Sequence, residues 1–537
     1  MPKYRIYTLL KYVSIFLVPA SILFFRFYKL NYSEFQGDEI EAQEYLLFEG
    51  DLKTFLLTRS KGPMQYLITY LMNTIFLNSK ISELIVRIPF AFAGILCLLA
   101  FYFFIYKNFG KKTAVISSSM LGLSGLIIAF SRIAQYQSFV LLLSILSVYL
   151  IYKSFNEQRN LYLLSGAILS GLALLFHYDS LSFIIPIFLI LCLRKKTSAA
   201  AQYLIITIAV ASVFYIPFIF NPAFKETLKY LWEKRILTGN YYSVSQSFEL
   251  LSIYHSKEYL IVLLAGILLW FYNVSKRFSN LAKLLTSLFI ATYALRIVNN
   301  EELLKLLYPL SVLLFLLVIL SYVLQYYKTQ PDKVGIFEFW FLISFFMYGV
   351  IIKFPLTHIY AYFIPMIFIS SYSLTTFVKP KFLYPLVTLV FASAFSFNYQ
   401  AFIDTRKEYP WQKKNYIFGK MYDGIAENLK VKGIFGFPYK RGWEDVRNDI
   451  FTLSLQQGGA GRTFTFDSNE KPDIPLFYLN KGSSGGVNYT FTQNDPDFYI
   501  YIKRPQSLVS TLKVKGTPAK RGDMYEIYLK GTYKLKV

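Results

Sequence analysis

The chain has 537 residues, of which 55% are hydrophobic, 19% aromatic and only 16% charged. This composition excludes an ordinary soluble domain and a disordered chain, and together with a mean hydropathy of +0.40 it is typical of a polytopic membrane protein. The formal net charge of +24 does not indicate nucleic-acid binding, because much of the excess lies in short loops between apolar segments. Membrane topology and anionic lipid account for such loops.

Apolar segments long enough to cross the hydrocarbon layer recur through residue 400. They predict an all-α polytopic domain over residues 1–400, with about thirteen transmembrane helices. Their approximate ranges are 8–29, 84–106, 113–131, 135–153, 161–178, 180–194, 201–220, 258–274, 281–298, 302–326, 335–354, 357–378 and 382–399.

Residues 401–537 are polar and rich in turns, and they predict a small α/β domain. We expect helices near 413–430 and 443–457. We expect strands in GIFGFPY, TFTFD and DFYIYIKR, followed by a hairpin from Ser510 to Lys530.

Basic residues occupy every second loop, which is the charge bias of cytoplasmic loops. The loop after the first span, residues 31–83, is instead acidic. We therefore expect a multi-pass protein with a cytoplasmic N-terminus. We also expect it in a prokaryotic plasma membrane. The loops at 31–83 and 221–257 and the C-terminal domain then lie on the extracytoplasmic side. Both cysteines, Cys97 and Cys192, fall inside apolar spans, so neither a disulfide framework nor a thiolate metal site is predicted.

An adjacent acidic pair, Asp38 and Glu39, follows the first span, at a depth where an ionised side chain is costly without a partner or a task. Further short motifs follow it in a characteristic order. In chain order they are Asp38-Glu39-x-x-Ala42, Lys61-Gly62-Pro63, Arg87-Ile88-Pro89, Ser131-Arg132, and a late group of Lys353, Pro355, His358 and Pro365. In this order and topology, residues 1–400 resemble the GT-C glycosyltransferases, in the branch of the protein O-mannosyltransferases and lipid A aminoarabinose transferases.

The resemblance implies an inverting transfer of a hexose or pentose from a polyprenyl-phosphate donor to an acceptor hydroxyl on the outer side of the membrane. Such a reaction needs a base for the hydroxyl proton and cations for the phosphate leaving group. Asp38 is the expected base. Neighbouring helical residues point about 100° apart, so Glu39 is given an accessory role in metal contact or acceptor orientation. The expected donor phosphate-binding residues are Lys61, Arg87, Arg132, His177, Lys353 and His358, and Tyr360 and Tyr362 are expected near the acceptor or sugar.

Two of these residues have a structural alternative in the first loop. Asp38, with Glu41 three residues on, also fits a capping-box-like helix start. Lys61 also fits an exposed lysine before a helix that begins at proline.

The remaining cations have alternatives as well. Arg87 and Arg132 also fit arginines that snorkel from helix ends. His177 replaces a lysine that the resembled enzymes often carry, and Asp179 also fits a helix cap.

No cofactor is required by these motifs. The three histidines lack the His-x-x-x-His spacing, so a dedicated zinc site is not predicted, whereas a divalent cation bridging Asp38 or Glu39 to phosphate is compatible with the sequence. The expected partners are the lipid-linked donor, membrane lipids and an acceptor protein, lipid or glycan, with no nucleic acid. The alternatives are a transporter or flippase for lipid-linked saccharide, and an oligosaccharide-block transferase or polymerase.

Overall fold

The computed structural model describes residues 17–48, 50–59, 61–76, 82–236, 244–276, 279–296, 301–329, 335–352, 355–421, 434–458, 461–481, 487–505 and 513–536. Seven helices in these residues are long and apolar enough to cross a membrane, and a bent helix pair adds an eighth. The chain is therefore a multi-pass membrane protein, as the sequence predicts. The number thirteen is not confirmed, because five further apolar helices have only 10–17 residues each.

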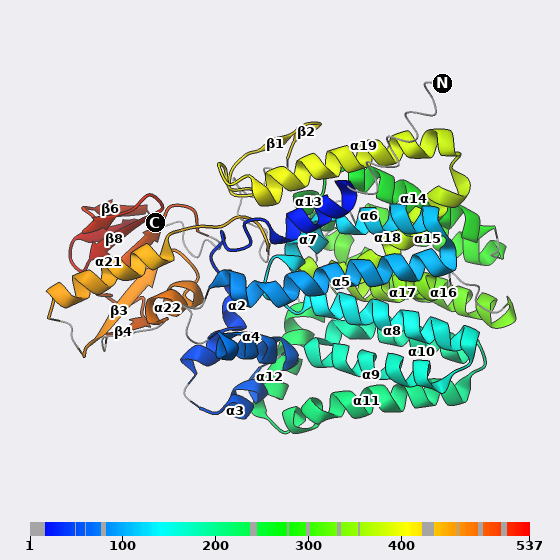
Figure 1. Ribbon diagram of the computed structural model, residues 1–537, viewed down its shortest axis with the longest axis horizontal. Coiled ribbons are helices and arrows are strands. Elements are labelled where there is room, and N and C mark those ends of the chain that lie inside the picture. The colour runs from blue at the N-terminus through cyan, green and yellow to red at the C-terminus, as the bar shows by residue number, and fades with distance from the viewer. Residues whose placement is uncertain are drawn as a thin grey trace.

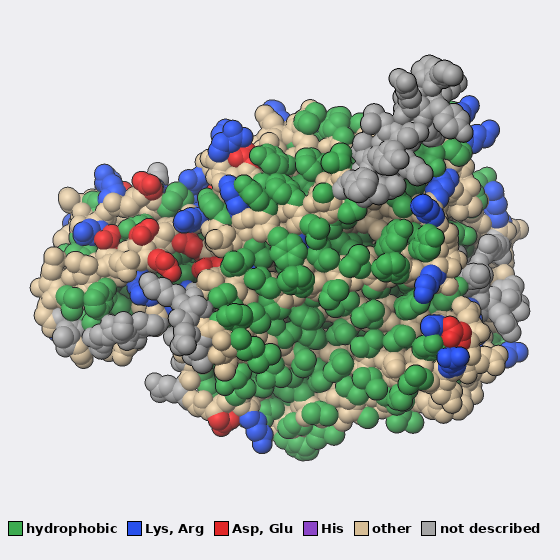
Figure 2. All heavy atoms as spheres, in the orientation of Figure 1, with side chains coloured by type: hydrophobic (Ala, Val, Ile, Leu, Met, Phe, Trp, Pro, Cys, Tyr) green, Lys and Arg blue, Asp and Glu red, His purple; other side chains and the backbone are tan. Residues whose placement is uncertain are grey.

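The apolar helices lie side by side in one bundle (Figure 1). Their hydrophobic side chains cover the visible face of that bundle (Figure 2). The helices are Leu17–Phe27, α5 (Glu83–Phe109), α6 (Lys111–Gly122), α7 (Gly125–Ser131), α8 (Gln137–Glu157), α9 (Asn160–Phe176), α10 (Leu181–Leu193), α11 (Thr197–Ile219), α14 (Lys257–Ser275), α15 (Asn280–Leu295), α16 (Glu301–Thr329), α17 (Gly335–Phe345), α18 (Phe363–Phe377) and α19 (Pro380–Asn398).

Helices α6 and α7 form the bent pair, with an angle of 63° between them. The bend brings Gly125 so close to the carbonyl oxygen of Tyr254 that a Cβ at this position would lie 1.8 Å from it. Only glycine fits this approach without a shift of the backbone. The chain after α7 therefore turns back at a fixed place, and Arg132 and Ala134 follow at this turn.

The loops at one end of the bundle are themselves helical. The first contains α2 (Gly37–Glu41), the 3₁₀ turn η1 (Glu44–Leu47), α3 (Leu52–Leu57) and α4 (Met64–Ile75). The second contains α12 (Pro222–Tyr230), the π-helical turn η3 (Leu231–Ile236) and α13 (Val244–Tyr254). In Figure 1 α2 and α4 lie at the end of the bundle that faces the C-terminal sheet, and we call this end the sheet end.

The C-terminal residues form the predicted α/β structure. Helices α21 (Trp443–Gln456) and α22 (Asp473–Asn480) accompany a five-stranded mixed sheet with the order β4-β3-β5-β8-β7. Strand β3 runs parallel to β4 and β5, and β8 pairs antiparallel with β5 and β7. The strands are β3 (Thr463–Ser468), β4 (Asn488–Phe491), β5 (Phe498–Ile502), β7 (Lys520–Arg521) and β8 (Tyr525–Leu529). Two small antiparallel pairs join β1 (Asn415–Tyr416) to β2 (Gly419–Lys420) and β6 (Lys513–Gly516) to β9 (Tyr533–Lys536).

Helix α21 and strands β3 and β5 agree with the expected elements, and part of the expected hairpin is present as β7 and β8. The helix predicted near 413–430 is wrong over residues 413–421, which contain the short β1–β2 pair. Here the Lys414 ammonium donates to two backbone carbonyls and the Tyr416 hydroxyl donates to Glu258, and these contacts hold the chain out of a helix. The rest of that range, 422–433, lies outside the described residues.

The strand expected in GIFGFPY is also wrong over residues 434–439. Gly436 has a φ of +81°, and its amide donates to the Gln36 side chain instead of to a strand neighbour. Contacts with the first loop therefore override the local β preference.

The C-terminal structure shares its core with the first loop and α5. Phe35 and Ile40 pack in one apolar cluster with Val86 and with residues of α21, α22 and the sheet. The Glu34 carboxylate, 8% exposed, accepts hydrogen bonds from the backbone amides of Arg441 and Trp443 at 2.6 and 2.8 Å. The first loop is therefore fixed from both sides, by the bundle and by the C-terminal structure.

Glu34 predicts a pH-dependent stability. Burial raises the pKa of its carboxyl to about 7, and the two amide donors only partly offset this effect. Because the folded state then binds a proton that the unfolded chain has lost, stability falls as pH rises from about 4.5 to about 7, by at most roughly 3 kcal/mol. We expect the thermal midpoint of Glu34→Gln to fall less between pH 5 and pH 7 than that of the wild type. Parallel curves for the two proteins would contradict this assignment.

Candidate functional site

The site is organised by a buried ion pair between Glu39 and Arg87. The side chains are 0% and 1% exposed. Arg87 Nε and Nη2 donate to the two Glu39 oxygens at 2.8 and 2.7 Å. Its Nη1 donates to the carbonyls of Leu30 and Ser33, and its Nη2 also donates to that of Glu34. All five guanidinium donors are thus used within the protein.

Glu39 is equally saturated. Besides Arg87, its carboxylate accepts the backbone amides of Gln36 at 3.1 Å and Ala134 at 2.9 Å. These contacts tie α2 to α5 and to the turn after α7. The carboxylate therefore has no lone pair directed at a metal or acceptor, and the geometry favours a structural role for Glu39 and Arg87.

Asp38 differs from its neighbour. It lies within the first turn of α2, whose N-cap is Gln36 and whose capping box is formed by Gln36 and Glu39, so Asp38 does not cap this helix. Its side chain is partly exposed, and among the described residues no hydrogen bond or ion pair to its carboxylate is found. The charge of Asp38 acts on Lys61, Tyr136 and Lys471. The Glu39 and Arg87 contacts thus leave an unengaged acid at the sheet end, with a cation nearby.

Lys61 forms an ion pair with Glu41, with 2.6 Å between Nζ and Oε2, and Tyr66 donates to the other Glu41 oxygen at 3.0 Å. The Lys61 side chain is 16% exposed, so it is not a freely solvated surface lysine. Burial alone would lower the pKa of the Lys61 ammonium, but Glu41 and Asp38 outweigh it and hold that pKa well above its usual value. Lys61 therefore stays charged.

The residues after Lys61 position it against α9. A Cβ on Gly62 would lie 2.0 Å from the carbonyl oxygen of Leu175, so the loop can lie against the end of this helix only with glycine here. Pro63 is then the N-cap of α4. This contact brings Lys61 next to the turn after α9, and its charge acts on His177.

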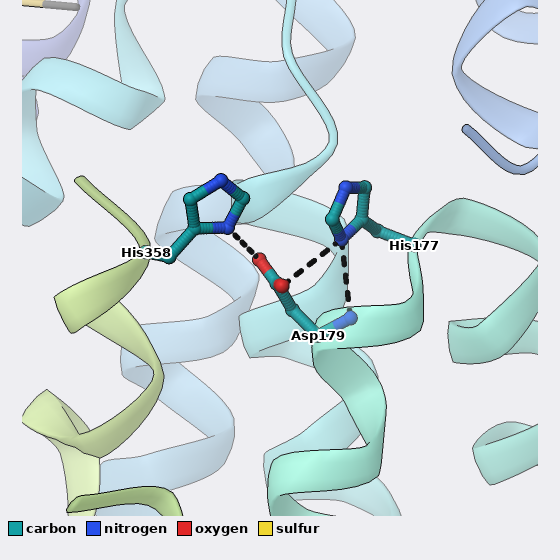
Figure 3. A group of neighbouring side chains, drawn as sticks. All are labelled: His177, Asp179 and His358. Atoms are coloured by element: carbon teal, nitrogen blue, oxygen red, sulfur yellow. Dashed lines mark hydrogen bonds and ion pairs between the residues drawn. The ribbon is translucent and has the colours of Figure 1, made fainter. Parts of the chain in front are cut away.

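The turn after α9 carries a second polar group. Asp179 lies in η2 (Tyr178–Ser180) and is fully buried. Its carboxylate accepts from the Tyr348 hydroxyl at 2.7 Å and is 2.7 Å from His358 Nδ1. The Asp179 amide donates to His177 Nδ1 at 3.1 Å. Figure 3 shows the two imidazoles flanking this carboxylate.

The remaining residues predicted for the donor or acceptor site do not form a single group among the described residues. Arg132 Nη1 donates to the carbonyls of Phe25 and Tyr28, so it closes the end of the first helix, and its contact with a donor phosphate stays a prediction. The charge of Asp179 acts on the buried Tyr360, whereas the Tyr362 ring packs 5.6 Å from that of Phe345. Lys353 lies outside the described residues.

Several polar residues of this region were not expected at the site. Tyr66 and Tyr348 belong to none of the motifs, Glu41 was considered only as part of a helix cap, and the spacing of the three in sequence gives no sign of their contacts. Arg235 in η3, whose charge acts on Tyr178 and Tyr348, had only the weak signal of lying in a loop that mixes aromatics with charges.

Fold and site together define a helical membrane protein with a polar centre at one end of its bundle. Residues 60–220 match the family model described as dolichyl-phosphate-mannose-protein mannosyltransferase. This match confirms the resemblance to the GT-C glycosyltransferases over that part of the chain.

The chain is also similar to two solved structures. It is 11% identical to ArnT from Cupriavidus metallidurans bound to undecaprenyl phosphate, covering 96% of this chain and 97% of that one with a TM-score of 0.49. It is 12% identical to the archaeal oligosaccharyltransferase AglB from Archaeoglobus fulgidus in complex with an inhibitory peptide and a dolichol-phosphate, covering 92% and 69% with a TM-score of 0.46. At identities of 11% and 12% and TM-scores below 0.5, these similarities do not assign a function to this chain. Among curated proteins, none matches this chain.

The buried pair predicts a large stability effect. Glu39→Gln leaves Arg87 without its counter-charge, which costs about 3–5 kcal/mol for a buried pair. The control is Glu44→Gln, which breaks a partly exposed pair with Arg59 in the same loop and costs about 1 kcal/mol or less. We expect thermal unfolding in detergent to show a much larger loss for Glu39→Gln, and equal losses would contradict the structural role.

Proposed function

We propose that this protein is an inverting glycosyltransferase that moves a sugar from a polyprenyl-phosphate donor to an acceptor hydroxyl on the extracytoplasmic side of the membrane. The observation that carries the proposal is the unengaged Asp38 carboxylate beside the charged, largely buried Lys61. The family match over residues 60–220 includes Lys61 and supports the same reaction class.

The reaction needs a negatively charged base and a cation, and the sheet end supplies both. The acceptor oxygen forms a bond to the anomeric carbon as the bond from that carbon to the phosphate oxygen breaks. Asp38 takes the hydroxyl proton, which typically contributes 10²- to 10⁴-fold. Lys61 stabilises the negative charge that develops on the departing polyprenyl phosphate.

Glu41 keeps Lys61 in the form that this role requires. Burial opposes ionisation of Glu41, but Lys61 outweighs burial and lowers the pKa of the Glu41 carboxyl. A buried ammonium that already has one carboxylate partner is held in a fixed place before the donor binds.

The charge distribution supports the proposed sidedness. At the end of the bundle opposite the sheet end, the charged side chains are mainly Lys and Arg (Figure 2). Cytoplasmic loops show this bias. We therefore place the sheet end, with Asp38 and Lys61, on the extracytoplasmic side.

We also propose residues 1–400 as the catalytic domain and residues 401–537 as an extracytoplasmic domain that helps to select the acceptor. The support is its position, because α22 packs against α2, the helix that carries Asp38.

Asp38→Asn tests the base directly. Asparagine keeps the size of the side chain but cannot take the proton, so we expect release of polyprenyl phosphate to fall by about 10²- to 10⁴-fold with little change in thermal stability. The assay incubates purified protein with a radiolabelled polyprenyl-phosphate monosaccharide and an acceptor extract. The control is Asp51→Asn in the same loop. Asp51 is the N-cap of α3, and asparagine caps a helix nearly as well as aspartate, so we expect this variant to behave as the wild type.

Full activity in Asp38→Asn would remove Asp38 as the base. Wild-type protein that moves the labelled lipid across a vesicle membrane without cleaving it would instead indicate a transporter.

Lys61→Met tests the cation. We expect a roughly 10²- to 10³-fold loss of turnover, the usual effect of removing a group that stabilises developing negative charge. Because this variant leaves Glu41 without its counter-charge, the double variant Lys61→Met/Glu41→Gln is measured beside it. The double variant should recover thermal stability but not turnover, and Lys53→Met, an exposed lysine of α3, should retain both. Recovered turnover in the double variant would assign Lys61 to structure alone.

A further inference from the structure

His177, Asp179 and His358 form a cluster of ligand-type side chains from distant parts of the chain. His177 follows the last residue of α9, Asp179 lies in η2, and His358 lies in the 3₁₀ turn η5 (Leu356–Tyr362). One ring nitrogen of each histidine and one carboxylate oxygen lie within 4.8 Å of one another. In Figure 3 the two imidazoles lie on either side of the Asp179 carboxylate and each is joined to it by a dashed line.

Neighbouring tyrosines hold all three side chains in place. The Tyr136 ring stacks on His177 with 3.9 Å between centroids and an angle of 2°. The Tyr348 ring lies parallel to that of His358, at 6.0 Å and 5°, and its hydroxyl donates to Asp179 Oδ1 at 2.7 Å. Outer contacts of this kind orient metal ligands and fix their geometry.

The atoms that face one another in the cluster carry lone pairs. His177 Nδ1 accepts the Asp179 amide, so this nitrogen carries a lone pair and no proton, and an ion bound there would replace that hydrogen bond. The same nitrogen is 3.2 Å from Asp179 Oδ1, another acceptor. Two acceptors at this distance repel each other unless a positive charge lies nearby. His358 Nδ1, 2.7 Å from Asp179 Oδ2, completes the group.

We propose that His177, Asp179 and His358 bind one divalent transition-metal ion. Two imidazole nitrogens and one carboxylate oxygen suit Zn²⁺, and related ions such as Co²⁺ and Mn²⁺ accept the same donors. Three protein ligands leave a coordination position open, as in catalytic rather than structural zinc sites. With neutral histidines, the occupied site carries a net positive charge.

This site is separate from Asp38 and Glu39, where the sequence allowed a cation. It lies in the same polar region as Lys61, whose charge acts on His177. An anion bound by Lys61 would therefore also be near the metal. The metal proposal does not depend on the proposed transfer reaction, because it rests on the three side chains alone.

Metal binding is tested on full-length protein purified in detergent with a histidine-free tag and stripped with a chelator. Zn²⁺ is titrated by calorimetry, and Co²⁺ is titrated by its visible d–d absorption. We expect one equivalent of each ion to bind to the wild type. His358→Ala, whose side chain is 17% exposed, should weaken binding by at least about 100-fold, and Tyr348→Phe, which keeps all three ligands, by about 10- to 100-fold.

The matched control is His255→Gln, which alters the one histidine outside the cluster; His255 bonds Ser124 and should be irrelevant to the metal. Wild-type protein without a stoichiometric ion would overturn the proposal and leave a protonated histidine as the positive charge in the cluster. Equal affinity of wild type and His358→Ala would overturn it too. The wild-type stoichiometry is decisive even if a variant fails to fold. Asp38→Asn should bind the metal normally, so failure of the transferase proposal and failure of the metal site are distinguishable.

Discussion

The buried ion pair between Glu39 and Arg87 is the contact on which the rest of the site depends. Two charges removed from water are stable only when every donor and acceptor is satisfied, and here the backbone of the first loop and the Ala134 amide complete the set. The pair therefore fixes the loop after the first helix to α5 and to the turn after α7. One residue earlier in the same helix, the partly exposed Asp38 carboxylate has no hydrogen bond or ion pair among the residues that the structure describes.

Two other constraints converge on the same place. The close approach of Gly62 to the end of α9 puts Lys61 beside the turn that carries His177 and Asp179. The Glu34 hydrogen bonds to the backbone after Tyr439 seat the C-terminal structure on the first loop. A small acidic loop thereby links the membrane helices to the sheet, and an acid, an ammonium and two imidazoles lie within one polar region of an apolar protein.

The sequence predicted the helical membrane domain, the α/β character of the C-terminal part and the acidic loop, because hydropathy and charge bias are local properties. It assigned Arg87 to phosphate, since a sequence does not reveal the backbone carbonyls that use its donors. It offered a helix cap as the alternative for Asp179 and gave no sign of Tyr348 and His358, which approach Asp179 from more than 160 residues away. It predicted a strand in GIFGFPY, where a tertiary contact from Gln36 decides the conformation. Where a prediction of secondary structure is wrong, long-range partners rather than local preferences decide the conformation.

The central claim is that the Glu39–Arg87 pair presents Asp38 and Lys61 to a lipid-borne phosphate. An experimental structure of the protein with a non-cleavable polyprenyl-phosphate sugar analogue tests this claim most directly. The account predicts the phosphate at hydrogen-bond distance from Lys61, with the anomeric carbon on the side of Asp38 and the Glu39–Arg87 contacts unchanged. A phosphate bound by Arg87 in place of Glu39, or at the opposite end of the bundle, would contradict it.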